Sequence, residues 1–324
     1  MSTKRRGHNE GTIRQRTDGA WEARLSLPGG KRKSFYGKTR REVQDKLRTA
    51  QRDLDNGVDL TTEKLTIARF LDQWLAASIK PSVRAKTYEG YESIVRVRVV
   101  PHIGRKSLGR ITPLEVQALY ADLATAGLSN RSIHHTHRVL HHAFTQAMRW
   151  GLIARNPCDG VTPPTPGRRE MHVLTQAQVA AFLDATRDHR MHALYVLAVT
   201  TGMRLGELLG LRWEDVDLES GKVVVRRALQ PQRGSGLVFV QPKTARSRRT
   251  VVLSQRAITA LHDHRRRQLE ARLLGGHDWR DQGLVFCNPS GGPLYPTYQT
   301  AVFQQALTQA RLPRIRFHDL RHTA

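Results

Sequence analysis

The last stretch of the sequence is Phe317-His318-Asp319-Leu320-Arg321-His322-Thr323-Ala324. His318 and Arg321 stand three positions apart, so a helix would place the imidazole and the guanidinium on one face. A guanidinium can bind two phosphate oxygens at once, and histidine transfers protons near neutral pH, so the pair suits a phosphodiester. Solvated helix faces carry the same spacing, and the pair alone is weak support for a site.

A second stretch, Thr201-Gly202-Met203-Arg204-Leu205-Gly206-Glu207-Leu208, follows an almost wholly apolar segment that predicts a buried helix over 191–199. Thr201-Gly202 breaks that helix, and the pattern places Arg204 at a turn into the next one. Glu207 follows Arg204 by three positions and can hold its guanidinium in one orientation. The alternative is a buried Arg–Glu pair with a purely structural role.

The composition predicts a partner that is a polyanion. The 324 residues contain 53 Lys and Arg against 28 Asp and Glu, a formal net charge of +25. Nucleic acid is the commonest polyanion in a cell. A ribosomal-type protein and an arginine-rich coding bias are the alternatives. A hydrophobic content of 39% favours folded domains over a disordered basic tail.

The two cysteines, Cys158 and Cys287, are far apart and form no C-x-x-C pair. They indicate neither a disulfide framework nor a zinc site and fit a reducing cytoplasm. The first residues are basic and polar without an apolar segment behind them, which does not resemble a signal peptide. No apolar run approaches membrane-spanning length. We therefore expect a soluble, cytoplasmic protein with no membrane partner.

Residues 1–60 predict a small domain of three strands and one helix. The strands are expected at 12–16, 20–26 and 31–36, separated by Asp18-Gly19 and by Pro28-Gly29-Gly30. Thr39-Arg40-Arg41-Glu42 then reads as a capping box that opens the helix. Such a sheet can lie in a DNA groove, and a solvated basic sheet is equally compatible. The basic candidates for DNA contact are Arg14, Arg16, Lys31, Arg32 and Lys33.

Residues 61–160 predict an all-α domain with four helices. Apolar stripes mark the first two around 70–75 and 88–95, Thr112-Pro113-Leu114-Glu115 caps the third, and the fourth covers 130–149. His134, His137 and His141 share one face of the fourth helix, but no carboxylate or thiol joins them at ligand spacing, so we predict no metal. Arg131 and Arg138 make a DNA-facing helix the better interpretation.

Residues 161–170 read as a linker, because Pro163, Pro164 and Pro166 favour an extended spacer. Arg168 and Arg169 at its end suit a strap along a phosphate backbone, and an inert connector is equally compatible.

Residues 171–324 predict mostly helices around a small sheet. Strands are expected at 222–227, 237–241, 250–253 and 284–286, and long helices at 254–274 and 296–310. Lys243 falls between the second and third strands, at the tip of a predicted hairpin, where a lysine is usually only solvated. Arg246 and Arg248 add positive charge beside it.

Three motifs resemble those of the tyrosine recombinases of the phage integrase type. They are Thr201 to Leu208, Pro242-Lys243-Thr244 leading into Arg249-Thr250-Val251, and His318 to Thr323. Their order and wide separation match that family. The resemblance implies a mainly α fold with small β-sheets (α+β): an arm-type DNA-binding domain, a helical SAM-like core-binding domain, and a mostly α catalytic domain with a small antiparallel sheet.

The resemblance also implies roles. Arg204 and Arg321 would bind the non-bridging oxygens of the scissile phosphate, Lys243 would protonate the leaving oxygen, and His318 would assist proton transfer. Fixed guanidinium donors suit the charge that builds on the phosphoryl oxygens. A phosphotyrosyl intermediate would conserve the energy of the phosphodiester, so no cofactor is expected. Double-stranded DNA at attachment sites would be the partner, bound by a homotetramer with accessory directionality or DNA-bending proteins.

One feature departs from the family, whose nucleophilic tyrosine follows the His-x-x-Arg segment. All seven tyrosines of this sequence precede it, so we assign no nucleophile and expect a truncated chain that is inactive alone. Two alternatives stay open. One is a DNA-binding decoy or integrase remnant without catalysis, and the other is an RNA-binding protein, which charge alone suggests.

Overall fold

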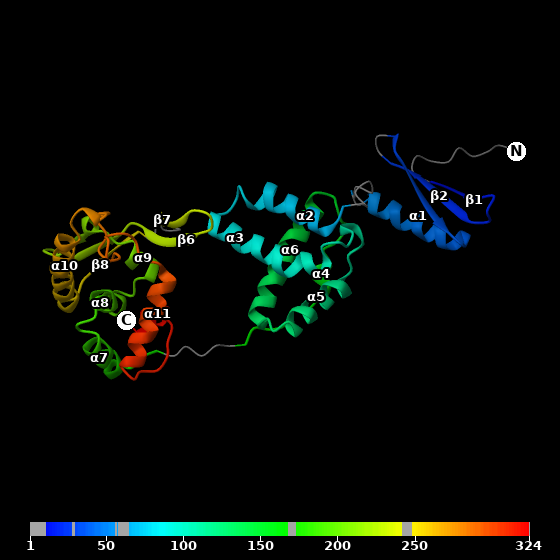
Figure 1. The fold of residues 1–324 in the computed structure, drawn as a ribbon. Coiled ribbons are helices and arrows are strands. Elements are labelled where there is room, and N and C mark those ends of the chain that lie inside the picture. Colours follow the sequence, from blue (N-terminus) through cyan, green and yellow to red (C-terminus); the bar gives the residue numbers. More distant parts are fainter. Residues whose placement is uncertain are drawn as a thin grey trace. The chain divides into compact units, whose positions relative to one another are not determined.

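A computed structural model describes residues 11–27, 30–55, 57, 65–167, 173–241 and 248–323 (Figure 1). The chain divides into two compact units between Arg168 and Arg169. Among the described residues, no helix combines the length and the apolar character that crossing a membrane requires.

The first unit begins with a three-stranded antiparallel sheet and a helix. They are β1 (Thr12–Gln15), β2 (Trp21–Ser26), β3 (Arg32–Gly37) and α1 (Arg40–Asp55). β2 is the central strand, and its side chains Ala23 and Leu25 are fully buried. They form a small core with Val43 and Leu47 of α1. The three strands and the helix predicted from the sequence are all present.

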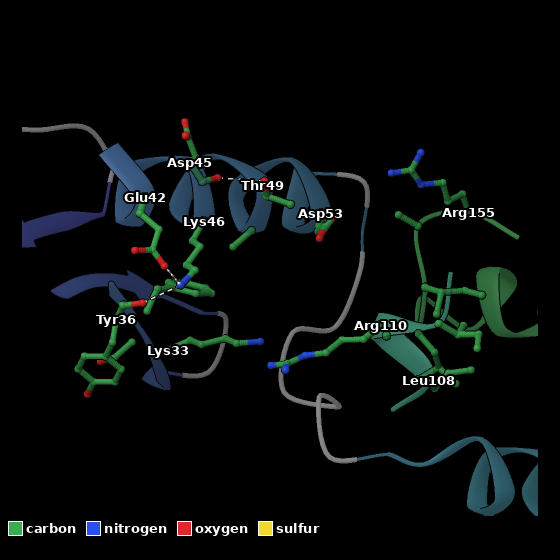
Figure 2. A pocket seen from close by; sticks show the side chains of 18 residues that line it. Lys33, Tyr36, Glu42, Asp45, Lys46, Thr49, Asp53, Leu108, Arg110 and Arg155 are labelled. Carbon is green, nitrogen blue, oxygen red and sulfur yellow. Dashed lines mark hydrogen bonds and ion pairs between the residues drawn. The ribbon is translucent and has the colours of Figure 1, made fainter. Parts of the chain in front are cut away.

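Lys46 fastens α1 to the edge of this sheet. Its Nζ donates to the carbonyl of Tyr36 at 2.8 Å and to Glu42 Oε1 at 2.6 Å (Figure 2). The expected capping box forms in modified form. The N–H of Glu42 donates to Thr39 Oγ1 at 3.2 Å, and the Glu42 carboxylate also accepts from the N–H of Lys38 at 2.9 Å. The cap therefore extends to the residue before Thr39.

The remainder of the first unit is helical. Its helices are α2 (Ile67–Trp74), α3 (Ala85–Ile94), α4 (Val100–Ile103), α5 (Pro113–Thr125) and α6 (Asn130–Arg149). α2 and α3 each continue into a π-helical turn, over Leu75–Ile79 and Val95–Val99, and short 3₁₀ turns cover Leu108–Arg110 and Pro157–Gly160. The capping box at Thr112 and Glu115 is confirmed in both directions. Residues 161–167 form neither helix nor strand.

The second unit places helices around short strands. The helices are α7 (Gln176–Ala185), α8 (His192–Thr201), α9 (Leu205–Leu209), α10 (Gln255–Gly275), α11 (Pro296–Gln309) and α12 (Leu320–Thr323). The strands are β4 (Val216–Asp217), β5 (Lys222–Val225), β6 (Ala228–Gln232), β7 (Gly236–Val240) and β8 (Arg249–Val252). Short 3₁₀ turns cover Trp213–Asp215, Gly276–Asp278 and Phe317–Asp319.

α8 is the central helix of this unit. Its residues from Ala193 to Val199 are all buried, as the apolar run predicted. α7, α9, α10 and α12 all contact α8 (Figure 1). A helix that is apolar on every side is stable only when neighbours cover it on every side. α8 is therefore the common support for the elements before and after it.

The strand pairing differs from the expected hairpin. β7 pairs with β6 to form one antiparallel sheet, and β8 pairs with β5 in a second sheet that also holds β4. The strands on either side of 242–247 therefore belong to different sheets, and the prediction of one hairpin around Lys243 was wrong. β6 was missed because it contains Pro231, which is rare in strands away from sheet edges.

The predicted strand at 284–286 was also wrong, because only a single bridge joins Leu284 to Arg212. Side chains of α10 bind the carbonyls that a ladder would need. His264 Nε2 donates to the carbonyl of Val285 at 2.7 Å, and Gln268 Nε2 donates to those of Leu284 and Val285 at 3.0 and 3.1 Å. The segment is thus held by side chains of α10 and by backbone hydrogen bonds to Leu211 and Trp213, and it does not form a ladder with a named strand.

The fold class predicted from the sequence is confirmed: the chain is mainly α with small antiparallel sheets. The described residues form three separate hydrophobic clusters, in residues 23–50, 67–158 and 174–320. The exact domain bounds, 1–60, 61–160, 161–170 and 171–324, stay a prediction.

Candidate functional site

The turn that carries Arg204 is formed by the end of α8. Gly202 caps α8 in the left-handed region, at φ 59° and ψ 22°, which glycine adopts at little cost. Arg204 itself is extended, at φ −73° and ψ 149°, and opens α9. Its N–H donates to Glu207 Oε2 at 3.0 Å. The backbone of Arg204 is thus fixed, while its side chain is 52% exposed.

Glu207 holds two arginines. Arg204 Nη1 donates to Oε1 at 2.8 Å, and Arg249 Nη2 donates to Oε2 at 2.8 Å. The Glu207 side chain is only 5% exposed. Burial opposes its ionisation, but the hydrogen bonds from Arg249 and Arg204 outweigh that effect and lower the pKa of Glu207. The carboxylate is therefore charged at neutral pH, as the predicted orienting role of Glu207 requires.

Sequence reasoning did not assign Arg249 to the site. It stood in the quoted motif, but nothing in its local pattern says that it reaches Glu207, because the two are 42 positions apart. A partner at that distance becomes visible only when β8 is placed beside α9.

The second segment carries His318 and Arg321. The 3₁₀ turn Phe317–Asp319 runs directly into α12, so the two residues lie in successive helical segments instead of one α-helix. Phe317 and Leu320 are buried in the core of this unit, and the Phe317 ring meets that of Phe303 edge-on at 5.2 Å. His318 is exposed and Arg321 is half-buried. The buried side chains of Phe317 and Leu320 thus fix the turn, while the side that carries His318 stays exposed to solvent.

Asp319 and Arg316 fix the start of this segment. Arg316 Nη2 donates to Asp319 Oδ1 at 2.6 Å, and the N–H of Arg316 donates to Oδ2 at 2.9 Å. The hydrogen bond from Arg316 lowers the pKa of Asp319. His318 lies between these two residues in the sequence, so the ion pair spans the turn that presents it.

Arg321 has a polar atom that the described structure leaves unsatisfied. Its Nη1 is buried and has no hydrogen-bond partner among the described residues. A buried guanidinium N–H without an acceptor costs about 1–3 kcal/mol or more, since the group is charged. Anions relieve such a cost, because their oxygens accept from guanidinium groups. Both α9, which follows Arg204, and α12, which carries Arg321, contact α8.

Comparisons with known proteins identify the family to which the sequence is similar. The catalytic part of the phage integrase family matches residues 172–324, and the N-terminal SAM-like domain of phage integrases matches residues 66–124. An integrase of Streptomyces ambofaciens is 32% identical over 328 residues, which cover 95% of this chain and 81% of that protein. The chain belongs to the phage integrase family of tyrosine recombinases.

Other relatives agree with this membership. A XerC-like tyrosine recombinase of Caldanaerobacter subterraneus subsp. tengcongensis is 30% identical over 311 residues, or 90% of this chain and 79% of that protein. Among solved structures, the Tn1549 transposon integrase in complex with transposon right end DNA has a TM-score of 0.69 at 21% identity, covering 80% of this chain and 85% of its own. A lambda integrase dimer bound to a COC′ core site has a TM-score of 0.60 at 18% identity, covering 99% and 88%. These two likenesses concern the fold.

Four predicted site residues lie outside the described residues: Lys243, Arg246, Arg168 and Arg169. Arg248 is described, and its Nη2 donates to Gln241 Oε1 at 2.8 Å. The assignments of all five to catalysis or DNA contact stay predictions.

The predicted arm residues differ in how they are held. Arg14 is tied to Glu22, whose side chain is 3% exposed, through contacts of 2.7 and 2.8 Å. Hydrogen bonds from Arg24 and then from Arg14 lower the pKa of Glu22 to about 2. Arg16 lies over the ring of Tyr36 at 5.4 Å. Lys31 and Arg32 are exposed and Lys33 is half-buried. Arg14 therefore has a structural partner in addition to its predicted contact with DNA.

On α6, Arg131 and Arg138 line one hollow with Ser132, His134 and His135. Arg98, from the π-helical turn Val95–Val99, also lines this hollow. The sequence analysis did not identify it. Its Nη1 donates to the carbonyl of Ser132 at 3.2 Å. Two exposed arginines around a concave surface are a suitable arrangement for phosphate contact.

The histidines of α6 make other contacts. His137 Nδ1 is 2.9 Å from the hydroxyl of Tyr120, and His141 Nε2 is 3.0 Å from Asp159 Oδ1. Burial, followed by the charges of His141 and His134, lowers the pKa of His137. Within the described part of the chain, no three His, Cys, Asp or Glu side chains are grouped so as to hold a metal ion.

Proposed function

We propose that this chain carries out site-specific recombination of double-stranded DNA, with Arg204, Lys243, His318 and Arg321 acting on the scissile phosphodiester. The observation that carries the proposal is the buried Nη1 of Arg321, which lies in the His-x-x-Arg segment and has no hydrogen-bond partner among the described residues. Arg204 supports it, because Glu207 fixes one terminal nitrogen while half of the side chain stays exposed.

In the proposed reaction a tyrosine hydroxyl attacks the phosphorus and the bond to the 5′ oxygen breaks. His318 accepts the proton of the hydroxyl, and Lys243 gives a proton to the leaving 5′ oxygen. Arg204 and Arg321 bind the non-bridging oxygens, on which negative charge builds in the transition state. The product is a 3′-phosphotyrosyl bond, from which a 5′ hydroxyl can reform the phosphodiester without a cofactor.

None of the seven tyrosines of the sequence is assigned as the nucleophile. Tyr120 and Tyr195 are buried, and burial raises the pKa of both hydroxyls, which disfavours the phenolate. Tyr295 and Tyr298 are exposed but precede the His318 segment, unlike the nucleophile of the family. The tyrosine is proposed to come from outside residues 1–324 or from another protomer.

The partner is proposed to be duplex DNA containing an attachment site. The relatives include a lambda integrase tetramer bound to a Holliday junction, and a homotetramer on DNA is proposed here by analogy. Accessory directionality or bending proteins would act with it in the cytoplasm. The net charge of +25 supports a polyanionic partner.

A selection experiment tests the proposal. Residues 1–324 are used to select duplexes from a random pool, and the selected site competes against unrelated duplex DNA and structured RNA. We expect preference for one duplex sequence. A preference for RNA would contradict the proposal and support the RNA-binding alternative.

Covalent chemistry is then tested on the selected site, nicked so that a phosphotyrosyl adduct is trapped. Residues 1–324 are expected to bind without an adduct, and the complete gene product is expected to form one. A covalent band from residues 1–324 alone would overturn the assignment of no nucleophile. Tight binding by the complete product with no covalent band would favour the non-catalytic decoy.

A further inference from the structure

The Glu207 carboxylate joins two arginines from distant parts of the second unit. Arg204 precedes it by three residues, while Arg249 is the first residue of β8. Arg249 Nη2 lies 2.8 Å from Oε2, and Nη1 lies 3.4 Å from Oε1. The Arg249 side chain is 28% exposed and that of Glu207 is 5% exposed. Solvent therefore screens this pair less than it would a surface ion pair.

A buried carboxylate forms hydrogen bonds with the donors within its reach, because a charged oxygen that is buried without a hydrogen bond lowers the stability of the fold. The two oxygens of Glu207 have about four acceptor positions. The N–H and Nη1 of Arg204 take one position on each oxygen, and Arg249 faces both oxygens. Arg204 therefore satisfies only part of the carboxylate, and its other guanidinium nitrogens donate to no residue in the described part of the chain.

We propose that Arg249 is a positioning residue for Arg204. By occupying the remaining acceptor positions of Glu207, it prevents the carboxylate from drawing both terminal nitrogens of Arg204 into a bidentate pair. Arg204 then keeps a free edge for the phosphate. This inference rests on the proposed role of Arg204 and adds a cause for its availability.

The position of Arg249 in the fold makes this role specific. β8 pairs with β5, with Arg249 opposite Val225, so the backbone of Arg249 is held by a sheet that does not include α9. Its guanidinium reaches from that sheet to Glu207 in α9. The contact therefore ties the Arg204 turn to the strand that follows the segment of Lys243 in the sequence.

Two other roles for Arg249 predict different results. Arg249 could only neutralise a buried charge, in which case its loss would lower stability and leave phosphate binding by the folded protein unchanged. It could instead bind phosphate itself, in which case its loss and the loss of Glu207 would act independently. The proposed role predicts that removing the charge of Glu207 repairs the loss of Arg249.

The test follows the Arg204 side chain directly by NMR of protein labelled with ¹⁵N-arginine. The Arg204 Nε–H signal is assigned from its absence in Arg204→Lys, and dimethyl phosphate is titrated as a phosphodiester probe. In Arg249→Ala we expect the affinity reported by this signal to fall about tenfold, equivalent to about 1.4 kcal/mol. In the double variant Arg249→Ala, Glu207→Gln we expect recovery to within about threefold of the unsubstituted protein.

Arg249→Lys should lie between the two, since an ammonium supplies the charge without the planar fork. Arg227→Ala is the matched control. Like Arg249→Ala, this substitution removes an arginine from beside a buried carboxylate. Arg227 Nη2 lies 3.5 Å from Asp215 Oδ2. Its effect on the Arg204 signal should be negligible. If Arg249→Ala does not fold, Arg249→Lys and the double variant carry the comparison, because neither leaves a carboxylate charge without a cation from position 249.

An unchanged affinity in folded Arg249→Ala would overturn the inference, as would losses that multiply in the double variant. With Arg249→Lys as the only folded single variant, an affinity equal to that of the unsubstituted protein would overturn it too. A different outcome would reject the proposed function itself: no response of the Arg204 signal to dimethyl phosphate in the unsubstituted protein. The two failures are therefore distinguishable.

Discussion

Arg316 and Asp319 repeat the relationship of Arg204 and Glu207. The N–H of Arg316 donates to Asp319 Oδ2 at 2.9 Å and its Nη2 to Oδ1 at 2.6 Å, while the corresponding contacts between Arg204 and Glu207 are 3.0 and 2.8 Å. Both arginines are extended and open a helical turn, with the acid three positions later. Each of the two segments of the candidate site therefore begins with a turn that an acidic side chain fixes, Glu207 in one and Asp319 in the other.

The Arg316–Asp319 pair predicts a pH-dependent stability. The pKa of Asp319 is lowered in the folded state, so its ionised carboxylate stabilises the fold. This contribution to the free energy of unfolding is complete above the ordinary aspartate pKa of about 3.9 and is lost as the pH falls through the folded-state pKa. Asp319→Asn should lower the free energy of unfolding by about 1–3 kcal/mol at pH 7. Urea denaturation at neutral and acidic pH measures this, and the difference should shrink in acid. An equal difference at every pH would contradict it.

Arg204→Ala should separate catalysis from binding. In a chain that includes the family's nucleophile, we expect cleavage to fall at least about a hundredfold, because a donor aimed at developing charge is removed. Affinity for the selected duplex should change little, since Arg204 is one of 53 cationic side chains. Gel-shift and single-turnover assays on the same preparation give both quantities. Equal losses of binding and cleavage would mean that Arg204 serves only to pair with Glu207.

DNA binding should weaken steeply with salt. A net charge of +25 predicts many phosphate contacts, each of which releases counterions. For about 6–10 contacts, affinity should fall by roughly 10³–10⁵ between 50 and 200 mM salt. Titrations at several salt concentrations give the slope of log affinity against log salt. A slope near zero would rule out an interface dominated by phosphate contacts.

Features determined by near neighbours could be predicted from the sequence. The cap at Thr112 forms as expected, because the residues that make it lie within three positions of one another. The break at Gly202 was also predictable, since a left-handed residue at a helix end favours glycine. The position of Arg204 at the turn into the next helix followed from the buried run before it.

Features determined by distant partners could not be predicted. β7 and β8 follow one another in the sequence, and this order alone predicted a hairpin between them. In the structure β7 pairs with β6 and β8 pairs with β5. Arg249 looks like any basic residue at the start of a strand until β8 is placed beside α9. The Nη1 of Arg321 likewise has no partner among the described residues because distant segments bury it, which its local sequence does not reveal.

Close packing of α9 on β6 gives a final prediction. A Cβ on Gly206 would lie 2.8 Å from the carbonyl oxygen of Leu229, a backbone atom that can move only with its strand. Gly206→Ala should therefore cost about 1–3 kcal/mol of stability through overpacking and shift the turn that holds Arg204 and Glu207. The Arg204 response to dimethyl phosphate should weaken with it.

Gly90→Ala is the matched control for this substitution. Gly90 lies in α3, and a Cβ there would meet no atom within 4 Å. Alanine is the better helix former by roughly 0.8–1.0 kcal/mol, so this variant should be more stable than the unsubstituted protein. Thermal unfolding and the Arg204 signal, measured on both variants, decide the matter. Equal stabilisation of the two variants would contradict the prediction, because it would show that the approach of β6 leaves room for a Cβ at position 206.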